Sequence, residues 1–271
     1  MLKDITIGQH FPGDTIVHRT DARLKLLLII AYVVILFVAT NPVGLTMSCV
    51  FLAVMYLLAK IPLKVVLKSL KPIVPIILFT VVLNLFMMKG EGKPLVDFWI
   101  IHIYWEGIRY AILMGVRILA LVAGTGLLTY TTSPIVLTDA IERLLKPFAK
   151  LHLPVHELAM MMTIALRFIP TLVDETDKIM NAQKARGAML DSGTLKQRVQ
   201  ALVPILIPLF ISAFRRADEL AMAMECRCYR GGEGRTRMRV LKFTMSDLWV
   251  TLVCVACYAA IFATRFWFVG I

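Results

Sequence analysis

Two arginines stand in similar surroundings 41 residues apart. Each lies between two small residues, in the triplets Ala185-Arg186-Gly187 and Cys226-Arg227-Cys228. A guanidinium group can form paired, charge-assisted hydrogen bonds with a carboxylate at a desolvated interface. The plainer role of an arginine near the end of a helix is a favourable cation at the helix C-terminus. The choice depends on the elements that carry the two residues.

The cysteines and glycines give no pattern of a metal site or a nucleotide site. Cys226 and Cys228 have no histidine close by, and Cys254 and Cys257 lie inside an apolar run, so the usual spacing of zinc ligands is absent. The glycine-rich run at residues 231–234 lacks the lysine of a phosphate-binding loop. We therefore expect no catalytic residue, no cofactor, no metal ion and no binding of ATP by this chain alone.

The composition is that of a membrane protein. Of the 271 residues, 59% are hydrophobic and 18% are charged, and the mean hydropathy is +0.77. Soluble domains are about half apolar and about a quarter charged. The net charge is nevertheless +12, because 30 lysines and arginines outnumber 18 acidic residues. We expect an integral membrane protein whose basic face lies toward the cytoplasm, with the lipid bilayer and no nucleic acid as a partner.

Uncharged runs long enough to cross a bilayer predict five membrane-spanning helices, since about 20 apolar residues span the hydrocarbon. Residues 26–59 contain no charged side chain and are divided into two helices by an Asn-Pro-Val-Gly turn at residues 41–44. The other spans are predicted at residues 72–88, 105–129 and 248–268. The predicted fold class is an all-α integral membrane protein with about five transmembrane helices.

The positions of the lysines predict the orientation in the membrane. Lys60, Lys64, Lys68 and Lys71 fill the loop after the second span, whereas the turn at residues 41–44 is uncharged. We therefore expect a multi-pass membrane protein with its N-terminus in the cytoplasm. Five spans then leave the C-terminus outside the cell.

More than half of each charge type lies between the fourth and fifth spans. Residues 133–242 show a helical period almost throughout. Three helices are predicted there: one that Pro134 opens, one at about 155–187 and one at about 194–229. The predicted organisation is a cytoplasmic segment at 1–25, four spans within 26–130, a cytoplasmic or interfacial helical domain at 131–242, and the fifth span at 243–271.

The third of these helices carries two further patterns. Residues 199–214 are uncharged, but this stretch is short, contains two prolines and is basic at both ends, so we expect it to lie at the cytoplasmic face of the bilayer. Small residues repeat every four positions at Ala213, Ala217 and Ala221, a spacing that lets a second helix cross closely. The preceding helix offers a partner surface made of Leu172, Ile179, Ala182 and Ala185.

Arg117 lies near the middle of the fourth predicted span. A charge at that depth is expensive and ordinarily faces protein or water. Asn84 in the third span is one partner with which it could pair. The residues leave a functional role and a structural pairing equally open.

The chain resembles the family of transmembrane T components of energy-coupling factor (ECF) vitamin transporters. This family also includes cobalt-uptake homologues. The resemblance covers nearly the whole chain. It rests on residues 8–14 (GQHFPGD), 18–25 (HRTDARLK) and 165–172 (ALRFIPTL) and on the paired triplets around Arg186 and Arg227. The second triplet departs from Ala-Arg-Gly by having cysteine on both sides of the arginine.

The resemblance implies a scaffold that performs no catalysis. It implies that the two long helices between spans 4 and 5 are crossed coupling helices. It also implies that Arg186 and Arg227, with their flanking residues, dock to two ABC-type ATPase subunits. A membrane-embedded, substrate-binding S component is the third implied partner.

Two other classes of function stay open from the sequence. One is a membrane-embedded enzyme that uses Asp174, Glu175 and Asp177, although these acids more ordinarily form a solvated face. The other is a self-sufficient permease, against which five spans without an obvious polar pathway argue. A scaffold would co-purify with two ATPases and be inactive alone, whereas an enzyme would be active alone.

Overall fold

The computed structural model describes residues 10–87, 96–98, 101–151, 154–188, 194–231 and 243–267. The chain divides into two compact units. The bundle unit comprises Gly8–Ala140 and Val240–Ile271, and the long-helix unit is built on Ile141–Arg239.

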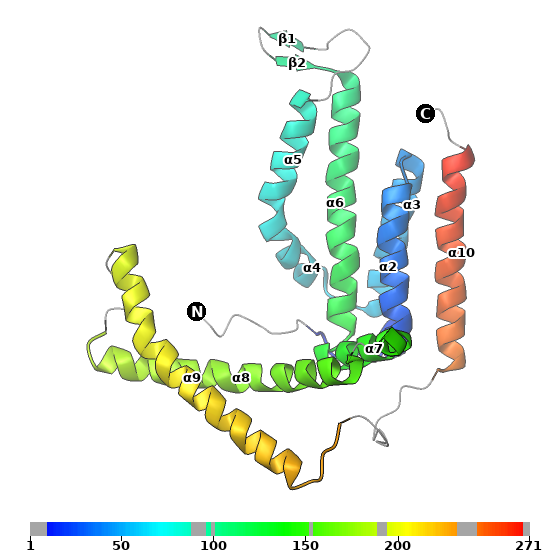
Figure 1. Ribbon diagram of the computed structural model, residues 1–271. Helices are drawn as coiled ribbons and strands as arrows, with labels where there is room; N and C mark the ends of the chain where they lie inside the picture. Colours follow the sequence, from blue (N-terminus) through cyan, green and yellow to red (C-terminus); the bar gives the residue numbers. More distant parts are fainter. Residues whose placement is uncertain are drawn as a thin grey trace. The chain divides into compact units, whose positions relative to one another are not determined.

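Helices make up most of the bundle unit (Figure 1). In chain order they are α1 (Ile16–Arg19), α2 (Ala22–Val38), α3 (Pro42–Ala59), α4 (Leu63–Leu70), a 3₁₀ turn (Lys71–Ile73), α5 (Val74–Met87), α6 (Trp105–Thr131) and α10 (Met245–Trp267). Their boundaries follow local sequence signals. The Asp21 side chain accepts a hydrogen bond from the Arg23 N–H at the start of α2, and Pro42 occupies the first turn of α3.

The core of the bundle unit lies among α2, α3, α6 and α10. Leu36 and Ile261 are fully buried there. Gly124 of α6 lets the ring of Tyr32 approach closely, because a Cβ at Gly124 would lie 2.5 Å from a ring carbon. Tyr258 donates a hydrogen bond from its hydroxyl to the Leu28 carbonyl at 3.1 Å. Close packing and satisfied hydroxyls thus join helices that are far apart in the sequence.

The predicted fold class is confirmed, because the structure is a helical membrane protein. The five predicted spans correspond to α2, α3, α5, α6 and α10. Among the described residues, however, six helices are long and apolar enough to cross a membrane: α3, the segment Leu63–Phe86, α6, α8, α9 and α10. With 17 residues, α2 is about 25 Å long, slightly shorter than a typical hydrocarbon core. The count therefore differs from five.

Two predicted loops contain regular structure. The lysine-rich loop after the second span forms α4, whose apolar and basic residues follow a helical period. The loop before α6 contains a short antiparallel hairpin of β1 (Val96–Phe98) and β2 (Ile101–Ile103), in which Asp97 pairs with His102. Length and charge alone did not reveal either element.

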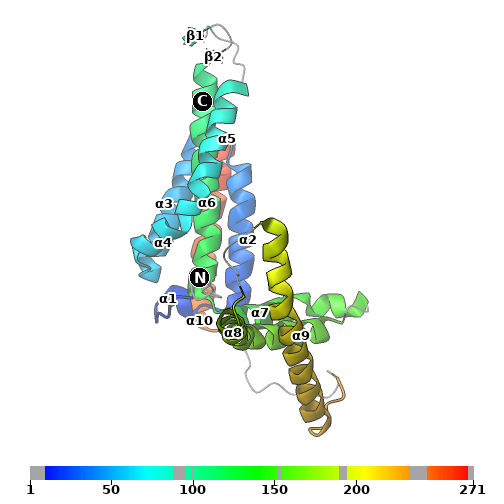
Figure 2. The same ribbon diagram turned by 90° about the vertical axis from the view of Figure 1, so that its left-hand side faces the viewer.

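The long-helix unit contains two helices of 31 residues, α8 (Val155–Ala185) and α9 (Leu195–Glu225), which cross each other (Figures 1 and 2). They follow α7 (Pro134–Leu145), which begins in the bundle unit, and a 3₁₀ turn at Lys146–Leu151. The predictions that Pro134 opens α7 and that a long helix begins at residue 155 are confirmed. The end predicted for α9 near residue 229 is too late, because the chain turns at Cys226–Cys228.

Candidate partner-binding site at the tips of the long helices

The C-terminal tip of α8 ends in a turn that presents Arg186. Gly187 adopts a left-handed conformation with φ of 86°, which a residue without a Cβ reaches at little cost. The Gly187 N–H donates to the Lys184 carbonyl, and the Ala188 N–H reaches back to the Gln183 carbonyl, both at 3.0 Å. These two bonds satisfy carbonyls that the last helical turn would otherwise leave unpaired.

The tip of α9 repeats this backbone arrangement 41 positions later. Cys228 takes the left-handed position with φ of 55°. Its N–H donates to the Glu225 carbonyl at 2.8 Å, and the Tyr229 N–H donates to the Met224 carbonyl at 3.1 Å. A cysteine has a Cβ, so this conformation costs about 1 kcal/mol that glycine avoids. Arg227 thereby occupies the same place in its turn as Arg186.

A third helix end shows which part of this arrangement is general. At the end of α3, Lys60 has φ of 53°, its N–H donates to the Leu57 carbonyl, and the Ile61 N–H donates to the Tyr56 carbonyl. The turn is therefore a common way to end a helix. In α3 the residue before the left-handed position is the buried Ala59. Of these three ends, those of α8 and α9 present an exposed arginine at that place.

The side chains of Arg186 and Arg227 are available for a partner. All six residues of the two triplets are exposed. Neither arginine makes a hydrogen bond or ion pair with any residue that the structure describes. Each tip can therefore offer a complete guanidinium group, with five N–H donors, to carboxylates or carbonyls of another protein.

Two polar contacts link α8 and α9 where they cross. Arg216 of α9 donates to Glu175 of α8 at 3.1 Å. Nearer the end of α8, the Gln183 amide donates to the Pro204 carbonyl at 3.2 Å. Pro204 is one of two prolines inside α9. Ile205 beside it is buried. The two helices therefore run past each other in opposite directions, and α9 continues beyond the crossing to its tip.

The residues predicted to form this crossing differ in exposure: Leu172 and Ile179 of α8 and Ala213 of α9 are partly buried. Ala182 and Ala185 of α8 and Ala217 and Ala221 of α9 are exposed. The small-residue spacing permits a close helix contact but does not say which helix provides it. Ala217 and Ala221 belong to an open apolar face of α9, which also includes the exposed Phe210 and Phe214.

With this geometry established, comparison with known proteins gives a clear family. A model of the CbiQ family, described as a cobalt transport protein, matches residues 13–238. That match includes both crossed helices and both arginine-bearing tips. The chain belongs to the CbiQ family.

Curated relatives in this family are closely similar along their full length. A protein of Clostridium kluyveri is 53% identical over 267 residues, which cover 98% of this chain and 99% of the relative. A Thermosediminibacter oceani protein is 54% identical over 247 residues, or 91% and 92% of the two chains. A Bacillus subtilis protein is 46% identical over 265 residues, or 98% and 100%. All three are named energy-coupling factor transporter transmembrane protein EcfT.

In this member of the CbiQ family, Arg117 pairs with a helix end. Its guanidinium donates to the Ala39 carbonyl at 2.7 Å, at the C-terminal cap of α2. A cation there is favoured by the exposed carbonyls and the helix dipole. Asn84, the partner suggested by the sequence, instead donates to the Thr80 carbonyl in its own helix. Among the described residues, the Arg117 Nε is buried without a partner.

The family motif at residues 18–25 forms a polar cluster at one end of the bundle unit. Lys25 is buried and donates to the His18 carbonyl at 2.9 Å and the Thr131 carbonyl at 3.1 Å. Asp21 binds the Arg23 guanidinium at 2.7 Å, and its N–H donates to Asp247 of α10 at 3.1 Å. The motif therefore ties α2 to the end of α6 and the start of α10.

Asp247 is the part of this cluster that the sequence interpretation missed. It is buried, and its second carboxylate oxygen accepts the Thr244 N–H at 2.8 Å. The signal was present as a threonine followed three residues later by an acid, just before an apolar run, which is a helix-capping pattern.

His18 joins the N-terminal segment to the same cluster. Its Nε2 donates to the Phe11 carbonyl at 3.1 Å, and its Nδ1 accepts from the Thr15 hydroxyl at 2.7 Å. Burial lowers the pKa of the His18 imidazole below its usual value, which favours this neutral form. The Phe11 N–H donates to the Tyr130 carbonyl at 2.9 Å. The described part of the motif, residues 10–14, is thus anchored to α6 through Phe11.

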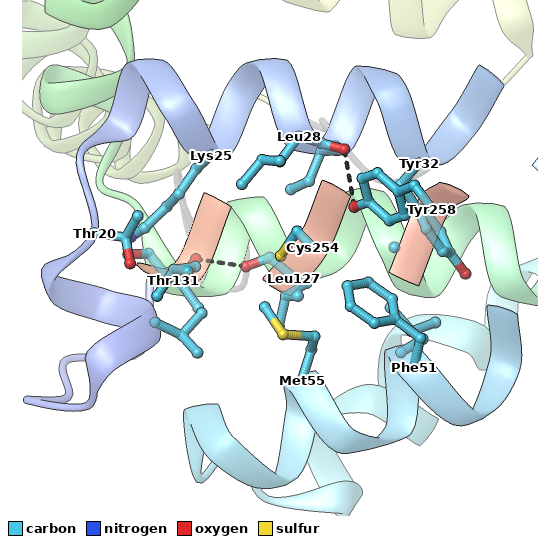
Figure 3. A pocket seen from close by; sticks show the side chains of 15 residues that line it. Thr20, Lys25, Leu28, Tyr32, Phe51, Met55, Leu127, Thr131, Cys254 and Tyr258 are labelled. Atoms are coloured by element: carbon cyan, nitrogen blue, oxygen red, sulfur yellow. Dashed lines mark hydrogen bonds between the residues drawn. The ribbon is translucent and has the colours of Figure 1, made fainter. Parts of the chain in front are cut away.

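A small apolar cavity of about 40 Å³ lies in the bundle core beside this cluster (Figure 3). Figure 3 shows Lys25 at one end of it and the rings of Tyr32, Phe51 and Tyr258 at the other. The Tyr258 hydroxyl is already paired with the Leu28 carbonyl. The volume and lining fit water-sized species but not a vitamin-sized solute.

The residues considered for other chemistry do not converge in the part of the chain that the structure describes. Glu175 is paired with Arg216, while Asp174 is exposed. No group of three or more histidines, cysteines and acids among these residues could hold a metal ion. Cys226, Cys228, Cys254 and Cys257 are all free thiols.

Proposed function

We propose that this chain is the transmembrane scaffold of an ATP-driven importer of the ECF type in the bacterial cell membrane. It couples two ABC-type ATPase subunits to a membrane-embedded, substrate-binding S component. The crossed helices α8 and α9 are the coupling elements, and the chain itself catalyses no reaction. In this arrangement the N-terminus and the helix tips lie in the cytoplasm, and the C-terminus lies outside.

The observation that carries this proposal is the equivalence of the two tips. Residues 183–188 and 224–229 form the same pair of backbone hydrogen bonds. Each has a left-handed residue at the equivalent position, and an exposed arginine precedes that residue. Two ATPase subunits of one kind offer two equivalent grooves, so a scaffold that contacts both needs two equivalent projections. A single exposed arginine at a helix end would not indicate docking, because a cation is favourable at any helix C-terminus.

The chemistry at each tip fits a protein groove. The small residues that flank Arg186 and Arg227 add little bulk, so the whole turn can enter a narrow depression. Once water is excluded, a guanidinium paired with a carboxylate gains more than it would at an open surface. Replacement of one partner in such a pair then costs about 2–5 kcal/mol of binding, since a charge is left buried and unpaired.

The crossed helices would transmit movement from the ATPases to the membrane. ATP-driven closure of the two ATPases would move the two tips relative to each other. Because α8 and α9 are long helices held together at Glu175–Arg216 and Gln183–Pro204, movement at the tips is transmitted along them. The S component would tilt in response and release its vitamin toward the cytoplasm.

The test is vitamin uptake by cells that depend on this chain as their T component. We expect Arg186→Glu or Arg227→Glu to abolish uptake while the protein still inserts in the membrane at its normal level. Arg215→Glu is the matched control, since Arg215 is an exposed arginine of α9 away from the tip. Normal uptake with both tip arginines replaced would rule the proposal out.

A further inference from the structure

The short helix α4 carries a strongly basic face. Lys64, Lys68 and Lys71 are spaced four and three residues apart, so at 100° per residue they lie within an arc of about 60°. All three lysines are exposed. Such a narrow arc concentrates three positive charges along a helix of eight residues and the residue that follows it.

The other faces of α4 are apolar, and they differ in exposure. Val66 lies opposite the lysines and is buried, and α4 contacts α6 of the same unit. Leu63 and Leu67 lie between these two faces and are 70% and 65% exposed. One side of α4 is therefore held against the bundle, while a second apolar side and the lysines are both open. This is the pattern of a helix that lies in the interface of a membrane.

The charge on this face is not neutralised within the described part of the chain. The sequence contains no acidic residue between Asp21 and Glu91. None of Lys64, Lys68 and Lys71 forms a hydrogen bond or ion pair with a described residue. Lys60 is different, since it lines a groove together with Asp14, so we do not include it in this face.

The third span predicted from the sequence begins at residue 72, so α4 lies just before it, at the expected membrane boundary. The 3₁₀ turn at Lys71–Ile73 connects α4 directly to α5, the third predicted span, whose residues are almost all apolar. Figure 2 shows α4 turned away from the axis of α5 below this turn. Lysines at the end of a span extend their ammonium groups toward the headgroups while their methylene stems stay among apolar groups.

We propose that α4 binds the headgroups of anionic phospholipids. Lys64, Lys68 and Lys71 contact the phosphate groups, and Leu63 and Leu67 insert among the first methylene groups of the acyl chains. A lipid surface satisfies both open faces at once, because it offers negative charge beside an apolar layer. An acidic protein partner would pair with the lysines but would not by itself cover the two leucines.

The experiment uses the full chain in bilayer nanodiscs with a fluorescent reporter on α4. The four native tryptophans are replaced by phenylalanine, and Leu67→Trp places a new indole beside the lysines. Nanodiscs contain equal amounts of phosphatidylglycerol and phosphatidylcholine, with bromine atoms on the acyl chains of one lipid or the other. Bromine quenches the fluorescence only of a nearby indole, so the two measurements compare the lipids next to α4.

With the native lysines we expect phosphatidylglycerol to be enriched over phosphatidylcholine beside α4 by about fivefold or more, the factor that one lysine near an anionic surface contributes. High salt should weaken the enrichment. The triple variant K64Q/K68Q/K71Q should bring the ratio close to one. The control K146Q/K150Q/K178Q removes the same charge from exposed lysines of the other unit and should leave the ratio unchanged.

Equal quenching by the two lipids with the native lysines would overturn the proposal, as would an enrichment that survives K64Q/K68Q/K71Q. A second measurement keeps the native tryptophans. Native mass spectrometry of the full chain from mixed micelles should show fewer retained phosphatidylglycerol molecules for K64Q/K68Q/K71Q than for K146Q/K150Q/K178Q. Equal retention by these two variants would also contradict the proposal.

Discussion

The bundle unit and the long-helix unit differ in how much of their own apolar surface they bury. In the bundle unit, α2, α3, α6 and α10 enclose side chains such as Leu36 and Ile261, which are 0% and 1% exposed. In the described part of the long-helix unit, the buried apolar residues are Val155, Ala159 and Ile205. Two 31-residue helices thus contribute very little core.

This difference indicates how the apolar surface of each unit is covered. A helix in water is stabilised mainly by packing its apolar face against another element. On α9, Phe210 and Phe214 are 61% and 68% exposed, and Ala217 and Ala221 are exposed as well. Such a continuous apolar face marks a surface for another protein or for lipid. The bundle unit has its own core, whereas the described part of the long-helix unit leaves most of its apolar side chains open.

The largest expected effect is on the free energy of unfolding. It appears when a substitution in the core of the bundle unit is compared with one on the exposed face of the long-helix unit. Leu36→Ala removes a fully buried side chain and should lower the free energy of unfolding by about 2–4 kcal/mol. Phe214→Ala should change it by less than about 0.5 kcal/mol. Unfolding of the purified chain in detergent, followed by circular dichroism, compares the two. A larger loss for Phe214→Ala would reverse the contrast between the units.

A smaller effect is expected at the polar cluster of the bundle unit. Lys25→Met removes the buried donor to the His18 and Thr131 carbonyls, and these acceptors then stay unpaired. We expect a loss of about 1–3 kcal/mol in the same unfolding measurement. Lys178→Met, at an exposed lysine of α8, is the control and should have no measurable effect. Equal results for both lysines would show that the cluster does not hold the bundle together.

The smallest effect concerns the strained tip of α9. Cys228→Gly removes the Cβ from a left-handed position and should stabilise the turn by up to about 1 kcal/mol. The Tyr229 amide, which donates to the Met224 carbonyl, should then exchange its hydrogen up to about fivefold more slowly. Gly187→Ala should do the reverse at Ala188 in the tip of α8. If neither amide responds, the two tips do not depend on the turn in the way the structure indicates.

Much of the helical framework could be predicted from the sequence, because it follows from local signals. The start of α7 at Pro134, the start of α8 at residue 155 and the break between α2 and α3 near Pro42 all reflect proline positions and apolar runs. The similarity of the two tips was also visible as two triplets. The structure adds that both tips share one backbone turn, in which Cys228 stands where glycine fits best.

What could not be predicted depends on three-dimensional neighbours. The alanine spacing on α9 indicated a close helix contact, but it did not reveal the polar contacts that Glu175 and Gln183 of α8 make with α9. The capping pattern at Thr244 and Asp247 indicates a helix start, but only the fold places Asp247 beside Asp21, 226 positions earlier in the sequence. Arg117 donates to the backbone carbonyl of a helix cap. Every residue has such a carbonyl, so the amino-acid sequence does not indicate which one Arg117 contacts.

The most direct test of the account is retention of the ATPase subunits by the assembled complex. The chain is co-expressed with two ABC-type ATPase subunits and an S component and is purified through an affinity tag on the chain. We predict that R186E/R227E loses both ATPases, while R109E/R215E, with the same change of charge at two exposed arginines away from the tips, retains them. Full retention of both ATPases by R186E/R227E would contradict the claim that the two tips are the docking points.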